Sequence, residues 1–107
     1  MPDIPLVKFS DAVRSGRVEW QRHVLERMLE RQVGRDNVLS VLLDGEIIEN
    51  YPDDFPFASA LVLGWIAGRP LHVVAALNKD ARMVAIITVY EPSTEYFESD
   101  FKTRKTT

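Results

Sequence analysis

One histidine and two arginines, His23, Arg27 and Arg31, follow one another at intervals of four residues. An α-helix turns about 100° per residue, so this spacing places the three side chains along one edge of a helix. A histidine beside arginines can perform acid–base chemistry next to a phosphate or another anion. The same row could equally be the solvated edge of an amphipathic helix, with its arginines favoured near the C-terminal end.

The second histidine, His72, interrupts the apolar run LHVVAAL, and Tyr90 ends the apolar run MVAIITVY. A lone histidine on an apolar strand is either a hydrogen-bonded interior residue or a catalyst. If His23 and His72 converged beside the arginines, they would supply a general base, a general acid and a cation for phosphate charge. A ribonuclease needs these groups to drive a 2′-hydroxyl onto its own phosphate without a metal. Tyr90 could donate a hydrogen bond or stack on a base, or be an ordinary strand-end aromatic.

The sequence contains no pattern for metal or thiol chemistry. It has no cysteine, and its two histidines lack the spacing of a metal site. Glu46 and Glu49 are three residues apart on an expected strand, which predicts that they point to opposite faces and form no carboxylate pair. We therefore expect no metal and no cofactor.

The composition is that of one soluble globular domain spanning residues 1–107. It is 46% apolar and 27% charged, and its formal net charge of −3 argues against a general nucleic-acid coat protein. Residues 14–35 carry six arginines against three glutamates, whereas residues 36–56 carry six acids and no base. These stretches either engage an anionic ligand or neutralise each other in the fold. Without cysteine, a secretory signal or a long apolar stretch, the chain is expected to be cytoplasmic and to have no membrane segment.

Apolar periodicity predicts an α+β fold, with two to three N-terminal helices packed on an antiparallel sheet of about four strands. Three helices are expected, over about residues 5–15, 20–32 and 36–43, and the second should bury Trp20, Val24, Leu25, Met28 and Leu29. Four strands are expected, in EIIENY (46–51), SALVLGWI (59–66), PLHVVAAL (70–77) and RMVAIITVY (82–90). The links between the last three are so short that the strands must be antiparallel neighbours.

Both faces of this predicted sheet are largely apolar. One face must pack on the helices. The other must be covered by the C-terminal residues or by a partner chain, or it must form an exposed apolar groove. The polar sequence after about Phe101 is expected to fray.

Four ordered blocks of sequence resemble a known domain family. RHVLERMLER, VLLDGEIIENYPDD, LVLGWIAGRPLHVVAAL and IITVYEPSTEYFESDFKTRK resemble the domain family of unknown function numbered 4258 (DUF4258). The resemblance covers about residues 20–105, and residues 1–18 form an N-terminal extension with a short helix. Val24 stands where the family often has a small residue.

The resemblance implies a fold related to the RelE/ParE-type toxins, in which helices pack on an antiparallel sheet and the site lies on the open sheet face. Members are similar to toxins that pair with small zinc-finger antitoxins, which implies an RNA-cleaving toxin or a relic of one. The implied site consists of His23, His72 and Tyr90 as catalytic residues and Arg27, Arg31 and Arg104 as substrate-binding residues. An antitoxin segment could then cover the second sheet face.

Three functional hypotheses follow from the sequence. The first is a metal-independent, RNase-like toxin domain. The second is a non-catalytic module that binds a protein or forms a homodimer through the second sheet face. The third is a regulatory domain that binds a small anion between Arg27, Arg31 and the C-terminal residues. If the helical row is a site, Arg27 and Arg31 should face the same cavity as His72. If it is structural, one of the two arginines should be clamped by Glu46, Glu49 or Glu91. We expect Arg31 in that structural role and Arg27 as the ligand contact.

Overall fold

Three helices precede a run of four longer strands in the computed structural model, which describes residues 3–106. The fold is α+β, as predicted. Each expected helix and strand is present, with its ends shifted by at most a few residues. The elements are α1 (Leu6–Arg14), β1 (Val18–Trp20), α2 (Arg22–Glu30), α3 (Arg35–Asp44), β2 (Glu46–Tyr51), β3 (Ser59–Ile66), β4 (Arg69–Asn78) and β5 (Met83–Tyr90).

The sheet has five strands, in the order β1-β5-β4-β3-β2, one more than predicted. Strands β2 to β5 form the expected antiparallel meander. The additional strand, β1, pairs in parallel with β5, so that Val18 lies opposite Val84 and Trp20 opposite Ile86. Trp20 therefore belongs to this strand and not to the first turn of α2. A three-residue strand shows no periodicity of its own, because it forms only when a distant partner strand is available.

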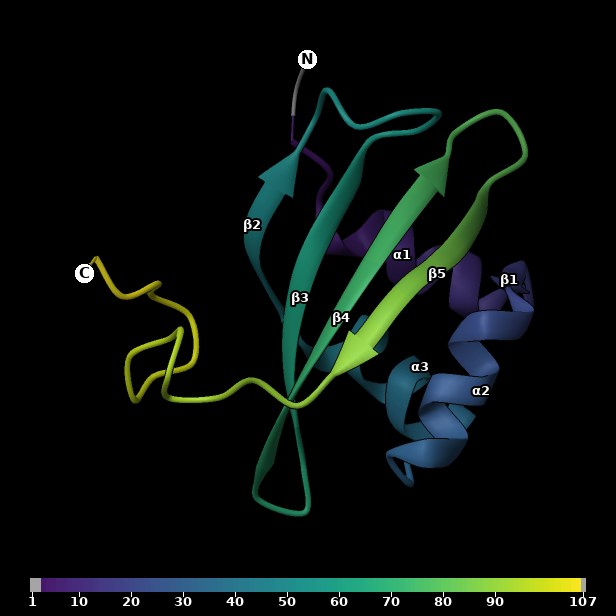
Figure 1. Cartoon of the computed structure of the whole chain (residues 1–107). Coiled ribbons are helices and arrows are strands. Elements are labelled where there is room, and N and C mark those ends of the chain that lie inside the picture. Colours follow the sequence, from purple (N-terminus) through teal and green to yellow (C-terminus); the bar gives the residue numbers. More distant parts are fainter. Residues whose placement is uncertain (1–2, 107) are drawn as a thin grey trace.

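The helices cover one face of the sheet, as Figure 1 shows, and the main hydrophobic core lies between them. Helix α2 packs mainly on β5 and buries Val24 and Met28, as expected. Leu29, in contrast, is 80% exposed, because contact with a single strand buries only a narrow stripe of the helix. Helix α3 lies close against β3. A Cβ atom at Gly64 would be 2.5 Å from Cγ2 of Val41, so only glycine permits this approach.

The C-terminal segment, residues 92–106, lies on the opposite side of the sheet from the helices (Figure 1). We call this segment the tail. It does not fray after Phe101, contrary to the sequence prediction. Phe97 and Arg104 form an isolated antiparallel bridge, and the Glu98 amide donates a hydrogen bond to the Thr103 carbonyl at 2.8 Å. The Asp100 carboxylate closes the turn between them by accepting hydrogen bonds from the Lys102 and Thr103 amides.

The tail gives the second sheet face a cover of its own. Leu61, Leu63 and Phe97 are buried there but are not part of the core cluster beneath the helices. Of the three possibilities that the sequence left open for this face, a cover formed by the chain's own C-terminal residues is the one observed. None of the helices in residues 3–106 has the length and apolar composition needed to cross a membrane.

Candidate functional site

Polar side chains from three strands and the tail meet on the tail-covered face of the sheet. In the strand register, Leu63 of β3 lies opposite His72 of β4, and His72 lies opposite Tyr90 of β5. Residues directly opposite on neighbouring strands share a face, so His72 and Tyr90 project to the same side as Leu63. Glu49 lies opposite Leu61, two residues before Leu63, and therefore projects to this side as well. The polar cluster consists of Glu49, Tyr51, His72, Tyr90 and Arg104.

A β-bulge in β2 places both of its glutamates on this face. Glu46 lies opposite Leu63 and Glu49 opposite Leu61, with the register shift between Ile47 and Glu49. The prediction that the two glutamates point to opposite faces was therefore wrong. The bulge adds one residue to β2, so two residues that are three positions apart point to the same face of the sheet. The regular alternation of a sequence cannot reveal such an extra residue. Both carboxylates consequently face the tail.

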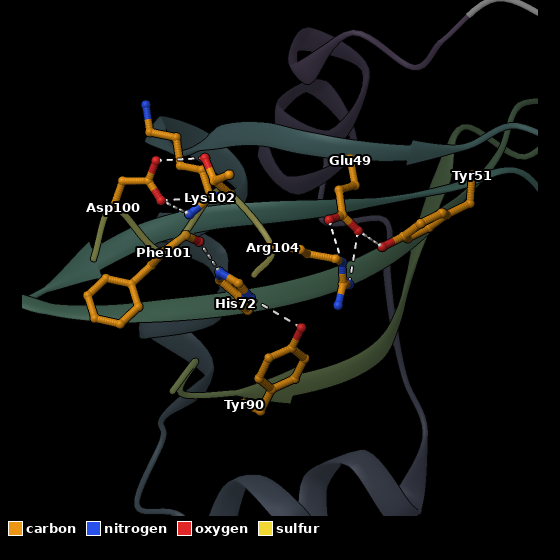
Figure 2. Close-up of polar contacts among 9 residues, drawn as sticks. Glu49, Tyr51, His72, Tyr90, Asp100, Phe101, Lys102 and Arg104 are labelled. Atoms are coloured by element: carbon orange, nitrogen blue, oxygen red, sulfur yellow. Dashed lines mark hydrogen bonds and ion pairs between the residues drawn. The ribbon is translucent and has the colours of Figure 1, made fainter. Parts of the chain in front are cut away.

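Arg104 of the tail is bound to Glu49 by a two-pronged ion pair (Figure 2). Its Nε lies 2.7 Å from Oε2 and its Nη2 lies 3.0 Å from Oε1 of the carboxylate. The Tyr51 hydroxyl donates a further hydrogen bond to Oε1 of Glu49. The hydrogen bonds from Arg104 hold the pKa of Glu49 below its usual value, whereas burial and the Glu49 carboxylate raise the pKa of Tyr51 to about 12. Glu49 is therefore ionised and Tyr51 protonated at neutral pH.

His72 is fully buried and is hydrogen-bonded at both ring nitrogens. Its Nε2 lies 2.8 Å from the Phe101 carbonyl oxygen, which can only accept, so this nitrogen carries the proton. Burial lowers the pKa of His72, so the ring is neutral at pH 7 and Nδ1 accepts the hydrogen bond of the Tyr90 hydroxyl at 3.1 Å. Burial raises the pKa of Tyr90, which keeps this hydroxyl protonated as a donor.

The tail closes over these groups with aromatic and ionic contacts. The Phe97 ring meets the His72 ring edge to face, with 4.8 Å between the centroids. The guanidinium carbon of Arg104 lies over the Phe97 ring, 4.8 Å from its centroid. Lys102 pairs with Glu46 at 3.2 Å, and Phe101 packs on Trp65. Figure 2 shows the Tyr90 hydroxyl directed at the His72 ring and the Arg104 guanidinium directed at the Glu49 carboxylate.

The helical row of His23, Arg27 and Arg31 lies on the helix side of the sheet, away from the polar cluster. His23 and Arg27 project from α2 into solvent, so the structure does not bring His23 together with His72. Arg31 follows the end of α2 and donates a hydrogen bond from Nη1 to the Val89 carbonyl at 2.5 Å. It also lines a cleft that reaches Tyr90, whereas Arg27 does not.

No glutamate clamps the arginines of this row in the described part of the chain. The three glutamates considered as partners are each paired elsewhere: Glu46 with Lys102, Glu49 with Arg104 and Glu91 with Arg69. Arg31 is instead held by a backbone carbonyl. Residues 3–106 contain no group of three histidine, aspartate or glutamate side chains that could hold a metal ion.

The family model described as "Domain of unknown function (DUF4258)" matches residues 20–91, which is more than half of the chain. The chain belongs to this family. No curated protein and no solved structure matches the chain.

The DUF4258 match divides the polar cluster between the shared domain and the tail. Glu49, Tyr51, His72 and Tyr90 lie inside the matched residues, whereas Arg104 lies beyond them. Three of the six residues singled out from the sequence, His72, Tyr90 and Arg104, are brought together here. The other three, His23, Arg27 and Arg31, are not part of the cluster.

Two members of the cluster, Glu49 and Tyr51, were not predicted from the sequence. One signal was available, because both belong to the motif block GEIIENY that carries the DUF4258 resemblance. Alternate residues of a strand share a face, so Glu49 and Tyr51 had to point to the same side. Their proximity to His72 depends on strand register across β3 and β4, and local sequence does not specify that register.

Proposed function

We propose that this protein is a small RNase-like toxin domain that cleaves RNA without a metal ion, at the tail-covered face of its sheet. The observation that carries the proposal is the convergence of His72, Tyr90 and Arg104 beside Glu49, from segments far apart in the sequence. Metal-independent RNA cleavage needs a proton acceptor for the 2′-hydroxyl, a proton donor for the leaving oxygen and a cation for the phosphate. The cluster contains one group of each kind.

In the proposed reaction, Nδ1 of His72 accepts the proton of the attacking 2′-hydroxyl and the Tyr90 hydroxyl protonates the leaving 5′-oxygen. A bond forms between the 2′-oxygen and phosphorus while the bond from phosphorus to the 5′-oxygen breaks, leaving a 2′,3′-cyclic phosphate and a 5′-hydroxyl. The hydrogen bond between Tyr90 and His72 then returns the proton from the imidazolium to the tyrosinate, which restores both residues.

Arg104 would bind the phosphate in this reaction. Its planar fork suits a phosphate as well as a carboxylate, so the substrate competes with Glu49 for the same donors. The tail must also move, because Phe97 and the Phe101 carbonyl cover His72. The folded chain with its tail in place is therefore the closed form of the enzyme.

The test compares two tyrosine variants of the full chain. Tyr90→Phe removes only the hydroxyl that contacts His72, and Tyr96→Phe is the matched control because Tyr96 is exposed on the tail. Growth after induction in a bacterium, cleavage of total RNA by the purified protein, and melting temperature are measured. We expect arrest and cleavage by the wild type and Tyr96→Phe, and a loss of about 100-fold or more in the cleavage rate for Tyr90→Phe. Equal cleavage by both variants, or none by the wild type, would contradict the proposal.

The second candidate is a non-catalytic interaction module. It is favoured by one observation: in the described chain, every buried side-chain nitrogen or oxygen already has a hydrogen-bond partner, including both nitrogens of His72. A cluster whose hydrogen bonds are all made within the chain can hold the tail in place without catalysing a reaction. This alternative predicts that neither tyrosine variant affects growth, and that the mass in solution reveals a stable dimer or a bound partner.

A further inference from the structure

A cleft of about 490 Å³ lies beside the polar cluster, on the far side of Tyr90. It is formed where the end of α2, the turn between β3 and β4, and the end of β5 come together. The volume falls in the range of small-molecule sites. Its lining residues are Arg31, Gln32, Val33, Asn37, Ile66, Ala67, Arg69, Pro70, Leu71, Tyr90 and Glu91.

Two guanidinium groups stand at this cleft. Arg31 is held in place by the Val89 carbonyl, and that bond uses only one of the five N–H donors of its side chain. Arg69 is paired with Glu91 at 2.7 Å, but both side chains are largely exposed. An exposed pair of this kind is weak, so an anionic ligand can take over the Arg69 donors at little expense. The side-chain amide of Asn37 adds a neutral hydrogen-bonding group.

The rest of the cleft is apolar. Val33, Ile66 and Pro70 are half-buried, and Leu71 is buried. A flat ring can pack against aliphatic side chains of this kind. The cleft therefore combines a site for an anion with a surface for a planar ring.

We propose that this cleft binds a nucleoside monophosphate group, with the phosphate between Arg31 and Arg69 and the base against Val33 and Ile66. The two arginine forks match the phosphate oxygens. The Glu91 carboxylate, once released by Arg69, can accept a hydrogen bond from a ribose hydroxyl. This site needs neither His72 nor Arg104, so it does not depend on the cleavage reaction proposed above. The group can come from a free nucleotide or from one unit of an RNA strand.

Binding at the cleft also reaches the polar cluster through one residue. Tyr90 is among the residues that line the cleft, and its hydroxyl is hydrogen-bonded to Nδ1 of His72. A ligand in the cleft therefore changes the surroundings of the His72 imidazole. The NMR signals of that ring report on occupancy of the cleft, and the signals of His23, exposed on α2, serve as the internal reference.

The experiment titrates the full chain with adenosine 5′-monophosphate by calorimetry and NMR, with adenosine and inorganic phosphate as partial ligands. Arg69→Gln and Arg31→Gln each remove one guanidinium from the cleft, and Arg27→Gln is the matched control on the same helix but outside it. We expect each cleft variant to weaken binding about tenfold and the control to leave it unchanged. Arg69 is exposed and holds no backbone group, so its variant remains folded even if Arg31→Gln lowers the melting temperature.

The inference is overturned if the nucleotide does not bind, if Arg27→Gln weakens binding as much as Arg69→Gln, or if phosphate alone binds as tightly as the nucleotide. A parallel titration with short oligoadenylate distinguishes the two sources of the ligand: tighter binding that Arg69→Gln weakens identifies RNA, and weaker binding identifies the free nucleotide. A chain that binds nucleotide but cleaves no RNA refutes the proposed function alone, and one that cleaves RNA without binding nucleotide refutes this inference alone.

Discussion

The two faces of the sheet are closed in different ways. The face beneath the helices is closed by large apolar side chains such as Phe9, Leu42 and Ile86, all fully buried. The face beneath the tail is closed around Glu49, His72 and Arg104, each held by specific hydrogen bonds. Apolar packing stabilises a fold more reliably than buried ionisable groups, whose desolvation offsets much of what their pairing contributes. The helix face thus contributes most of the stability of the fold, and the tail face carries the ionisable side chains on which the proposed function depends.

The largest effect is expected on the helix face. Leu42→Ala removes a fully buried side chain between α3 and the sheet and should lower the free energy of unfolding by about 2–5 kcal/mol. Leu29→Ala, on the exposed side of α2, is the control and should change it by less than about 0.5 kcal/mol. Urea denaturation of both variants measures the difference. Similar midpoints for the two would mean that the helix face does not dominate stability.

A smaller effect is expected from the ion pair that holds the tail. Arg104→Met leaves the Glu49 carboxylate partly buried without its cation and should lower the free energy of unfolding by about 1–2 kcal/mol. The double variant with Glu49→Gln should recover part of this loss, because the unpaired charge is gone. Urea denaturation of the two single variants and the double variant gives the coupling between the residues. Strictly additive effects would show that the pair contributes nothing to stability.

The smallest effect is expected from pH. Burial lowers the pKa of His72 in the folded protein below its ordinary value of about 6.5. At a pH between the pKa of the folded protein and that of the unfolded chain, the unfolded chain binds more protons than the folded one. The contribution of His72 to the free energy of unfolding should therefore be fully present above about pH 6.5 and decrease as the pH falls below it. Urea midpoints at pH 7.5, 6.5 and 5.5 test this, with His72→Gln as the reference. A decline of the same size in both proteins would assign it to other groups.

The sequence was sufficient for the order and type of most elements. Strands β2 and β3 have the predicted limits, because polar turns and a loop with two prolines bound their apolar runs. Two features could not be predicted, because each depends on contacts between distant parts of the chain. The first is β1, which exists only through its pairing with β5. The second is the ordered tail, which is polar in sequence but is held by Glu46, Glu49 and His72.

The candidate site was predictable to a similar extent. Residue chemistry singled out His72 and Tyr90, and the family resemblance added Arg104; these three residues do lie together. Residue chemistry also singled out His23 and Arg27, because their spacing on α2 suggested a shared function, but spacing along a helix does not determine which side of a sheet the helix covers. Glu49 was not predicted as part of the site, because its proximity to His72 depends on the strand register across β3 and β4, which local sequence does not specify.

The tail also affects the order in which the molecule can be completed during synthesis. Glu49 and Arg104 are 55 residues apart, and β1 has no partner until β5 has been made. A ribosome adds roughly 5–20 residues per second, so the strands that carry Glu49 and His72 emerge seconds before the tail that covers them. During this interval the polar cluster and the apolar side chains around it face the surroundings of the ribosome. Every newly made molecule therefore passes through an uncovered state, which ends only when residues 92–104 have emerged and folded over the sheet.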